Sequence, residues 1–178
     1  MSAITEEVIL DPEKEYEIVD GQPEEKIMGG ARHGGVGVRF AAELWMYVKA
    51  NRLGGVYGPG TLFRIGKNNR MPDVAFVSAA RIPEAGEPEG IWELPPDLAV
   101  EIISPSDLWE KVISKIEEYF AAGVRQVWLI SPTYRTLTVY HSPTRVTILS
   151  DNDELASDDI VPGFRLKIAE LFQTPARA

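Results

Sequence analysis

The chain of 178 residues contains no cysteine and only two histidines. The absence of cysteine excludes disulfides, thiolate metal ligands and a thiol nucleophile. No apolar run approaches the ~18 residues that a membrane-spanning helix needs. The acidic N-terminus also lacks the basic and then apolar order of a signal peptide. These absences predict a cytoplasmic protein that does not cross a membrane.

Basic residues are in the minority, with 18 Lys and Arg against 27 Asp and Glu and a net charge of −9. This balance argues against a general affinity for nucleic acid, because neutralisation of phosphates dominates such binding. Seven of the bases nevertheless fall within residues 31–70, which hold a single acid. This basic segment either faces a polyanion or is an ordinary solvated surface.

Apolar periodicity predicts one α/β domain over residues 16–173, preceded by an acidic arm at 1–15. An apolar residue at every fourth position predicts an amphipathic helix over 33–49, whose early glycines allow close approach of backbone or ligand. A second helix is predicted over 107–122, with a capping box at its start. It follows an apolar strand at 98–103 and precedes another at 127–130, a pattern that predicts parallel neighbours.

The remaining segments predict short strands and turns. Residues 16–28 read as a hairpin, 61–65 and 74–77 as strands joined by a turn at 66–69, and 79–96 as a proline-rich loop. Residues 136–149 read as a meander, followed by a short helix ending near residue 172. The expected sheet is therefore mixed, with helices packed against it.

Glu101 interrupts the apolar strand Leu98–Ile103. On period-two alternation Glu101 shares one face with Ala99 and Ile103. A carboxylate in such a strand costs several kcal/mol unless a metal, a partner charge or hydrogen bonds receive it. The alternative is a carboxylate at a strand end that caps the next helix.

Two further polar residues interrupt apolar segments. Asp73 opens the preceding strand, and Lys115 lies in the helix that follows Glu101. Two carboxylates at neighbouring strand ends repel each other and favour a bound cation, and hard oxygen ligands favour Mg²⁺. A nearby lysine could position an attacking water or stabilise transition-state charge.

Pro72-Asp73 followed by Glu101 on an apolar strand resembles the PD-(D/E)XK nuclease superfamily. Longer stretches narrow the resemblance to the Uma-type restriction-endonuclease-like family. They occur in the family's order and span nearly the whole chain: Tyr16–Gly21, Ala31–Gly34, Arg70–Val77, Val100–Ser106, Lys115–Ile130 and Val161–Phe164.

The resemblance implies a restriction-endonuclease-like α/β (α+β) core, a mixed β-sheet flanked by helices, with an N-terminal hairpin and a C-terminal meander. It also implies a Mg²⁺- or Mn²⁺-dependent endonuclease that hydrolyses DNA. Asp73 and Glu101 would be the metal ligands, and Lys115 would complete the catalytic set. No other cofactor is implied.

One departure from the superfamily pattern is that Ile103 stands where the usual lysine follows the strand acid. In this family the lysine is expected on the next helix, and Lys115 is at the matching position. Asp107 and Lys111 share the stripe of Lys115 and are supporting candidates, or else a solvated charged face.

Glu17 and His33 match family motifs and would support the site, Glu17 as a ligand or water holder. His33 would contact phosphate or orient a carboxylate, or else simply cap or pack its helix.

Two other functions remain open from the sequence. The missing lysine at position 103 and the acidic balance are compatible with a non-catalytic nucleic-acid-binding or structural module that keeps the fold. A metal-dependent hydrolase of a small phosphorylated molecule is a weaker option. A homodimer would suit cleavage of both strands of a symmetric duplex.

Overall fold

The computed structural model describes residues 11–27 and 29–174, so the first ten residues of the predicted arm and Met28 of the predicted hairpin lie outside the described residues. Within the arm, the carbonyl of Glu15 accepts a hydrogen bond from the Lys26 N–H at 2.9 Å. The elements in chain order are β1 (Tyr16–Val19), β2 (Gln22–Glu25), α1 (Ala31–Asn51), β3 (Gly54–Tyr57), β4 (Phe63–Ile65), β5 (Asn68–Arg70), β6 (Val74–Ser78), η1 (Ala79–Arg81), β7 (Leu98–Ile102), α2 (Trp109–Ala121), β8 (Gln126–Ser131), β9 (Thr136–Ser142), β10 (Arg145–Leu149), β11 (Glu154–Ser157), β12 (Phe164–Lys167) and α3 (Ile168–Leu171).

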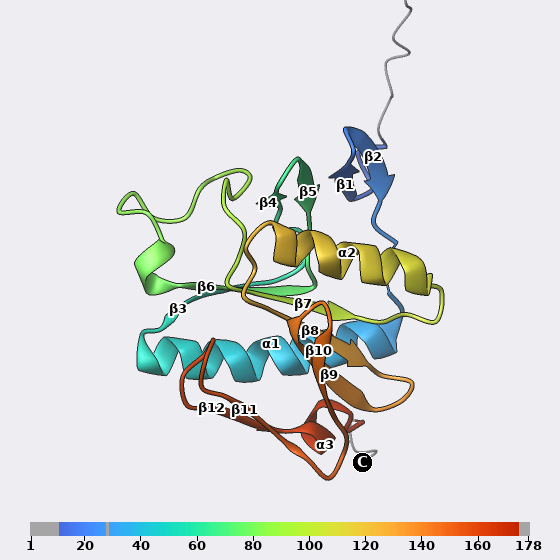
Figure 1. Cartoon of the computed structure of the whole chain (residues 1–178), viewed down its shortest axis with the longest axis vertical. Coiled ribbons are helices and arrows are strands. Elements are labelled where there is room, and N and C mark those ends of the chain that lie inside the picture. The colour runs from blue at the N-terminus through green and yellow to red at the C-terminus, as the bar shows by residue number, and fades with distance from the viewer. Residues whose placement is uncertain (1–10, 28, 175–178) are drawn as a thin grey trace, which may run out of the picture.

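A six-stranded sheet in the order β10-β9-β8-β7-β6-β3 forms the centre of the fold. Only β7 and β8 pair in parallel, joined through α2 as predicted, and the other neighbours are antiparallel. Figure 1 shows α1 and α2 on opposite sides of this sheet. The predicted mixed sheet flanked by helices is therefore confirmed.

The two faces of β7 pack against different helices, as its alternation predicts. Leu98, Val100 and Ile102 join the apolar cluster that includes the buried face of α1. Ala99 joins the cluster that includes Ile116 of α2. Because Glu101 lies on the same face as Ala99, its side chain is directed towards α2.

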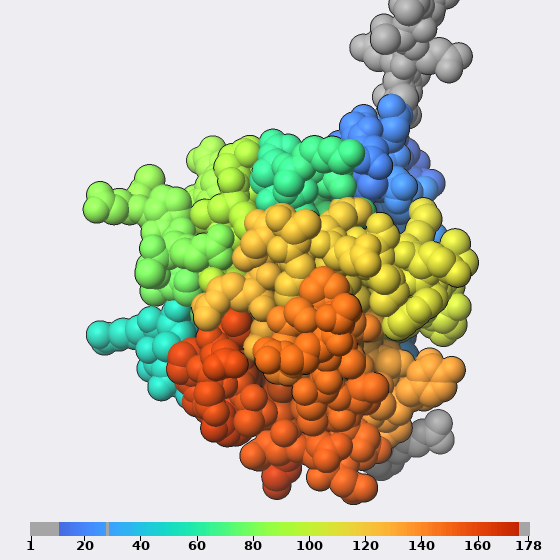
Figure 2. All heavy atoms as spheres, viewed as in Figure 1, coloured from blue at the N-terminus to red at the C-terminus, as the bar shows by residue number. Residues whose placement is uncertain are grey.

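Two smaller sheets complete the fold. The order β2-β1-β5-β4 brings the N-terminal hairpin against β5, and β11 pairs with β12. In Figure 2 the C-terminal segments, in orange and red, form a continuous surface below α2. The β2-β1-β5-β4 sheet positions the functional site, because it carries Glu17 and Arg70 on adjacent strands.

The structure corrects three local predictions. Asn68 and Asn69 belong to β5 rather than to the turn, because their buried amides find partners in Asp20, Arg64 and Glu118. The predicted capping box is wrong, since α2 begins after Leu108 with no side-chain cap. The pair β11 and β12 was not predicted.

No helix in residues 11–27 and 29–174 combines the length and the apolar character that crossing a bilayer requires. The longest, α1, fully buries one stripe of Val36, Phe40, Leu44 and Val48, while its opposite face is exposed. It is therefore an amphipathic helix that packs on the sheet.

We expect Leu44→Ala to lower the free energy of unfolding by about 2–5 kcal/mol, because Leu44 is fully buried and its truncation leaves a cavity. Met46→Ala on the same helix is the control, since Met46 is 51% exposed. Its effect should stay within about 0.5 kcal/mol. Urea denaturation measures both, and equal losses in the two variants would contradict the packing of α1.

Candidate active site

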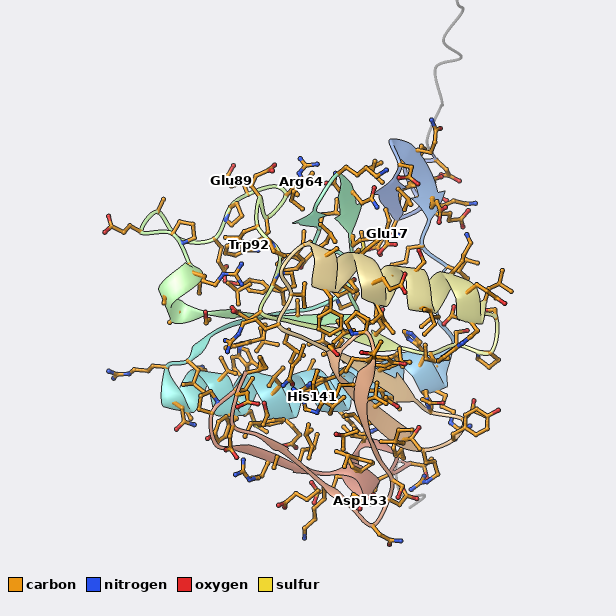
Figure 3. All side chains as sticks on the ribbon, in the orientation of Figure 1. Glu17, Arg64, Glu89, Trp92, His141 and Asp153 are labelled. Atoms are coloured by element: carbon orange, nitrogen blue, oxygen red, sulfur yellow. The ribbon has the colours of Figure 1, made fainter. Side chains whose placement is uncertain are left out.

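A cavity of about 600 Å³ lies beside α2 and is lined by all seven residues that the sequence singles out. They come from the N-terminal hairpin, the start of α1, the β6–β7 pair and α2. Figure 3 shows Glu17 beside α2, on the side of the N-terminal strands. The seven residues are Glu17, His33, Asp73, Glu101, Asp107, Lys111 and Lys115.

Antiparallel pairing of β6 and β7 brings the two central acids together. Val74 is opposite Val100, so continuing the register by one residue places Asp73 beside Glu101. The Asp73 Oδ2 atom accepts a hydrogen bond from the Ile102 N–H at 2.8 Å. Asp73, in the bend just before β6, is thus tied to β7 by this hydrogen bond, and Glu101 lies within β7 itself.

Three groups surround the buried Asp73 carboxylate. Lys26 Nζ lies 2.9 Å from Oδ1, and His33 Nε2 lies 3.4 Å from Oδ2. Burial opposes the charge of Asp73, but the hydrogen bond from His33 and the charge of Lys26 outweigh it and hold its pKa well below the usual value. Asp73 is therefore an anion throughout the neutral range.

Lys115 bridges two carboxylates from different sheets. Its Nζ lies 2.8 Å from Glu17 Oε1 and 2.9 Å from Glu101 Oε1. Burial opposes its charge, but attraction from Glu101 and Glu17 raises the pKa of Lys115 above the ordinary lysine value. Lys115 is therefore a cation and a hydrogen-bond donor at neutral pH.

The same oxygen of Glu101 receives a second donor. The Tyr119 hydroxyl donates to Glu101 Oε1 at 2.6 Å, one helical turn beyond Lys115. Burial, together with the negative charges of Asp73 and Glu17, raises the pKa of Glu101, and the attraction of Lys115 does not fully offset this effect. Among the described residues no hydrogen-bond donor reaches Glu101 Oε2, which leaves that oxygen available in the cavity.

Glu17 is held on both of its oxygens. Besides Lys115, Oε1 accepts from the Met71 N–H at 2.8 Å, and Oε2 accepts from Arg70 at 3.0 Å. Arg70 also pairs with Glu118 of α2 at 2.6 Å. Glu17 therefore links the N-terminal hairpin to α2 and orients Lys115.

Asp107 and Lys111 lie at the mouth of the cavity. The Asp107 carboxylate accepts a hydrogen bond from the Ser104 N–H at 2.7 Å, which closes the turn before α2. The Lys111 amine lies 3.4 Å from Glu24, and its side chain is 68% exposed. In the described part of the chain neither side chain contacts Asp73 or Glu101.

The basic segment 31–70 does not form one surface at this site. Of its seven bases only Arg70 lines the cavity, where acids already neutralise it. Arg64 pairs with Glu93, Lys67 with Asp20, and Arg39 donates to the Leu171 carbonyl. Arg64, Lys67 and Arg70 thus pair with acids instead of facing a common ligand.

Gly37 allows α1 to approach β7 at the cavity. A Cβ at this position would lie 3.0 Å from Ile102 Cδ1, closer than packed side chains allow without a shift. The close approach to another element is therefore to a side chain, and at Gly37 alone of the three early glycines, rather than to backbone or a ligand as predicted. It brings His33, on the turn before Gly37, to Asp73.

Sequence reasoning missed Lys26, Arg70 and Tyr119, which hold the carboxylates. Of these three residues, Tyr119 was the easiest to find from the sequence. It follows Lys115 by four residues, so both side chains lie on one face of the helix. Lys26 and Arg70 lie far from their partners in the chain, so no local pattern could identify them.

The donor set fits a hard divalent cation. In the described ranges no three side chains of His, Cys, Asp or Glu are placed to hold a metal together, so the protein offers two carboxylates. Mg²⁺ is commonly bound by one or two carboxylates and keeps several waters, for which the cavity has room. Asp73 Oδ1 and Glu101 Oε2 are the oxygens that the backbone and α2 leave available.

We expect His33 to titrate above the ordinary histidine pKa of about 6.5, because Asp73 favours its charged form. With a raised folded-state pKa, the pair stabilises the fold fully below the unfolded pKa and loses this contribution as pH rises through the folded value. NMR titration of the metal-free chain measures the midpoint, and His33→Gln assigns the signal. Asp73→Asn should lower the midpoint, and an unchanged midpoint in that variant would contradict the pairing.

Comparisons with known proteins give the fold and the family of the chain. A crystal structure described as "a putative nuclease belonging to DUF820", from Anabaena variabilis, superposes with a TM-score of 0.81 at 24% identity, covering 92% of this chain and 93% of that one. At this identity the match shows a shared fold. No curated protein matches the sequence. Residues 5–169 match the Uma2 family, described as "Putative restriction endonuclease", and the chain therefore belongs to that family.

Proposed function

We propose that the protein is a metal-dependent endonuclease that hydrolyses phosphodiester bonds of DNA. The observation that carries this proposal is the convergence of Asp73, Glu101 and Lys115 on one cavity, with each side chain held by neighbours. Membership of the Uma2 family and the likeness to a nuclease fold support the same reading. A cytoplasmic location and a homodimer belong to this proposal.

Asp73 and Glu101 would hold Mg²⁺ or Mn²⁺ through Oδ1 and Oε2. When bound, such an ion acidifies a water and neutralises charge on a phosphoryl oxygen. The hydrogen bond from the Ile102 N–H fixes the position of Asp73, and the Tyr119 hydroxyl fixes that of Glu101. Both carboxylates are thus oriented before the substrate enters, which lowers the cost of reorganisation during reaction.

Lys115 acts as a positive donor rather than as a base. Its raised pKa keeps the amine protonated at neutral pH, so it cannot accept a proton from water. Its ammonium can instead orient a water or stabilise the charge that develops on the phosphate. Glu17 holds the same ammonium that Glu101 contacts.

The charge of the cavity sets the order of binding. Eight acidic and four basic side chains line it, a net charge of −4 with His33 neutral. A phosphate is repelled by such a surface until cations offset part of this charge. Divalent metal therefore has to bind before, or together with, the DNA.

We expect Glu101→Gln and Lys115→Met each to reduce plasmid nicking in Mg²⁺ or Mn²⁺ by about 10²–10³-fold, because the first removes a proposed metal ligand and the second a donor that stabilises charge on the phosphate. Lys14→Met is the matched control, since Lys14 pairs with Glu25 on the surface and does not line the cavity. Nicking by both site variants at the wild-type rate would contradict the assignment. Metal binding without cleavage of any DNA form would favour the non-catalytic module.

We expect the affinity for duplex DNA to rise by about tenfold or more when Ca²⁺ replaces EDTA, because the cation offsets the negative cavity. Fluorescence anisotropy with labelled DNA at fixed ionic strength measures this change. The double variant Asp73→Asn with Glu101→Gln should lose the response to Ca²⁺. If the wild type binds DNA as tightly in EDTA as in Ca²⁺, the proposal that metal binds before or together with DNA is contradicted.

A further inference from the structure

Lys26 occupies a position in the cavity that the proposed chemistry does not use. It follows β2, and its side chain is only 14% exposed. Its ammonium contacts Asp73 Oδ1 at 2.9 Å and donates a hydrogen bond to the Met71 carbonyl. A lysine that is buried in this way is held by specific partners rather than by chance contacts on a surface.

The two oxygens of Asp73 have different kinds of partner. Oδ2 is bound by the Ile102 N–H, which belongs to the central sheet and cannot leave it without breaking the strand pairing. Oδ1 is paired with Lys26, whose flexible side chain can leave without any change in the sheet. Of the two oxygens, Oδ1 is therefore the exchangeable one.

The two oxygens of Glu101 also differ in their partners. Its Oε1 accepts from Tyr119 and contacts Lys115, while Oε2 has no donor in the described residues. The oxygens best placed for a shared cation are Oδ1 of Asp73, whose partner is a flexible side chain, and Oε2 of Glu101, which has no donor in the described residues. The ammonium of Lys26 thus lies beside the oxygen that such a cation would need.

An ammonium and a divalent ion compete for this oxygen. They repel each other, and each is attracted to the same carboxylate in a cavity where the effective dielectric is lower than in water. The buried Asp73 needs a counter-charge in either state, since an unpaired buried carboxylate is strongly destabilising. Lys26 meets this need at Oδ1 when no metal is bound, while His33 lies at Oδ2 in either state.

We propose that Lys26 is the resident counter-ion of Asp73 and leaves it when a divalent cation binds. This inference rests on the proposed metal site at Asp73 and Glu101. The exchange keeps the carboxylates in place in the metal-free protein and weakens its affinity for metal. It also couples occupancy of the site to the position of the segment that follows β2.

The first test replaces Lys26 with methionine, which keeps the length of the side chain and removes the competing charge. Isothermal titration calorimetry with Mn²⁺ should show binding about tenfold tighter than in the wild type, and the metal-free variant should melt at a lower temperature. Lys111→Met is the matched control, because it removes the same charge from the same cavity without a contact to Asp73. Its gain in affinity should be clearly smaller.

The outcomes separate the two proposals. Mn²⁺ binding to Lys26→Met with unchanged or weaker affinity overturns the role of Lys26 and leaves the metal site standing. A gain in Lys111→Met as large as in Lys26→Met also overturns it, because the effect would then be a general change in charge. No Mn²⁺ binding by the wild type overturns the metal site and, with it, the role of Lys26.

A second measurement keeps Lys26 in place and so does not depend on the folding of that variant. The chain has no cysteine, so Ile27→Cys provides a single site for a spin label next to Lys26, at a residue that is 74% exposed. Saturating Mg²⁺ should change the mobility of the label in this variant. The same Mg²⁺ should leave it unchanged when Lys26→Met is added, and an unchanged spectrum with Lys26 present would overturn the exchange.

Discussion

This structure depends on the pairing of buried carboxylates with a small number of lysine and arginine side chains. Glu17, Asp73 and Glu101 approach one cavity, and Lys26, Lys115 and Arg70 neutralise them. Removing one partner of a buried pair typically costs about 3–5 kcal/mol, because the other charge is left without compensation. These contacts join the N-terminal hairpin, the central sheet and α2, so the site and the packing of these elements are maintained by the same side chains.

The fold was predicted correctly where the sequence alternates between apolar and polar residues according to which side chains are buried. Leu98, Val100 and Ile102 alternate with Ala99 and Glu101, and the two sets face different helices in the structure. A charged residue that breaks such an alternation is informative, because the strand tolerates it only where another group receives the charge. For this reason Glu101 could be singled out as a candidate without any knowledge of its partners.

The partners could not be predicted, because they depend on how distant segments meet. Arg70 belongs to a short polar strand whose asparagines are typical of turns, and tertiary hydrogen bonds override that preference. Lys26 lies in an acidic hairpin, where a lysine normally signals only a solvated surface. The number of bases in a segment was also a poor guide, since the structure uses Arg64 and Lys67 to neutralise local acids.

The placement of Lys115 on a helix rather than on β7 has a chemical consequence. A lysine at position 103 would lie at the end of the strand, whereas Lys115 reaches the cavity between two carboxylates, Glu17 and Glu101. Two anionic neighbours favour the protonated amine more strongly than one would, since each adds an attraction that opposes loss of the proton. The position of Lys115 on the helix therefore keeps a protonated amine beside both acids, where it donates hydrogen bonds.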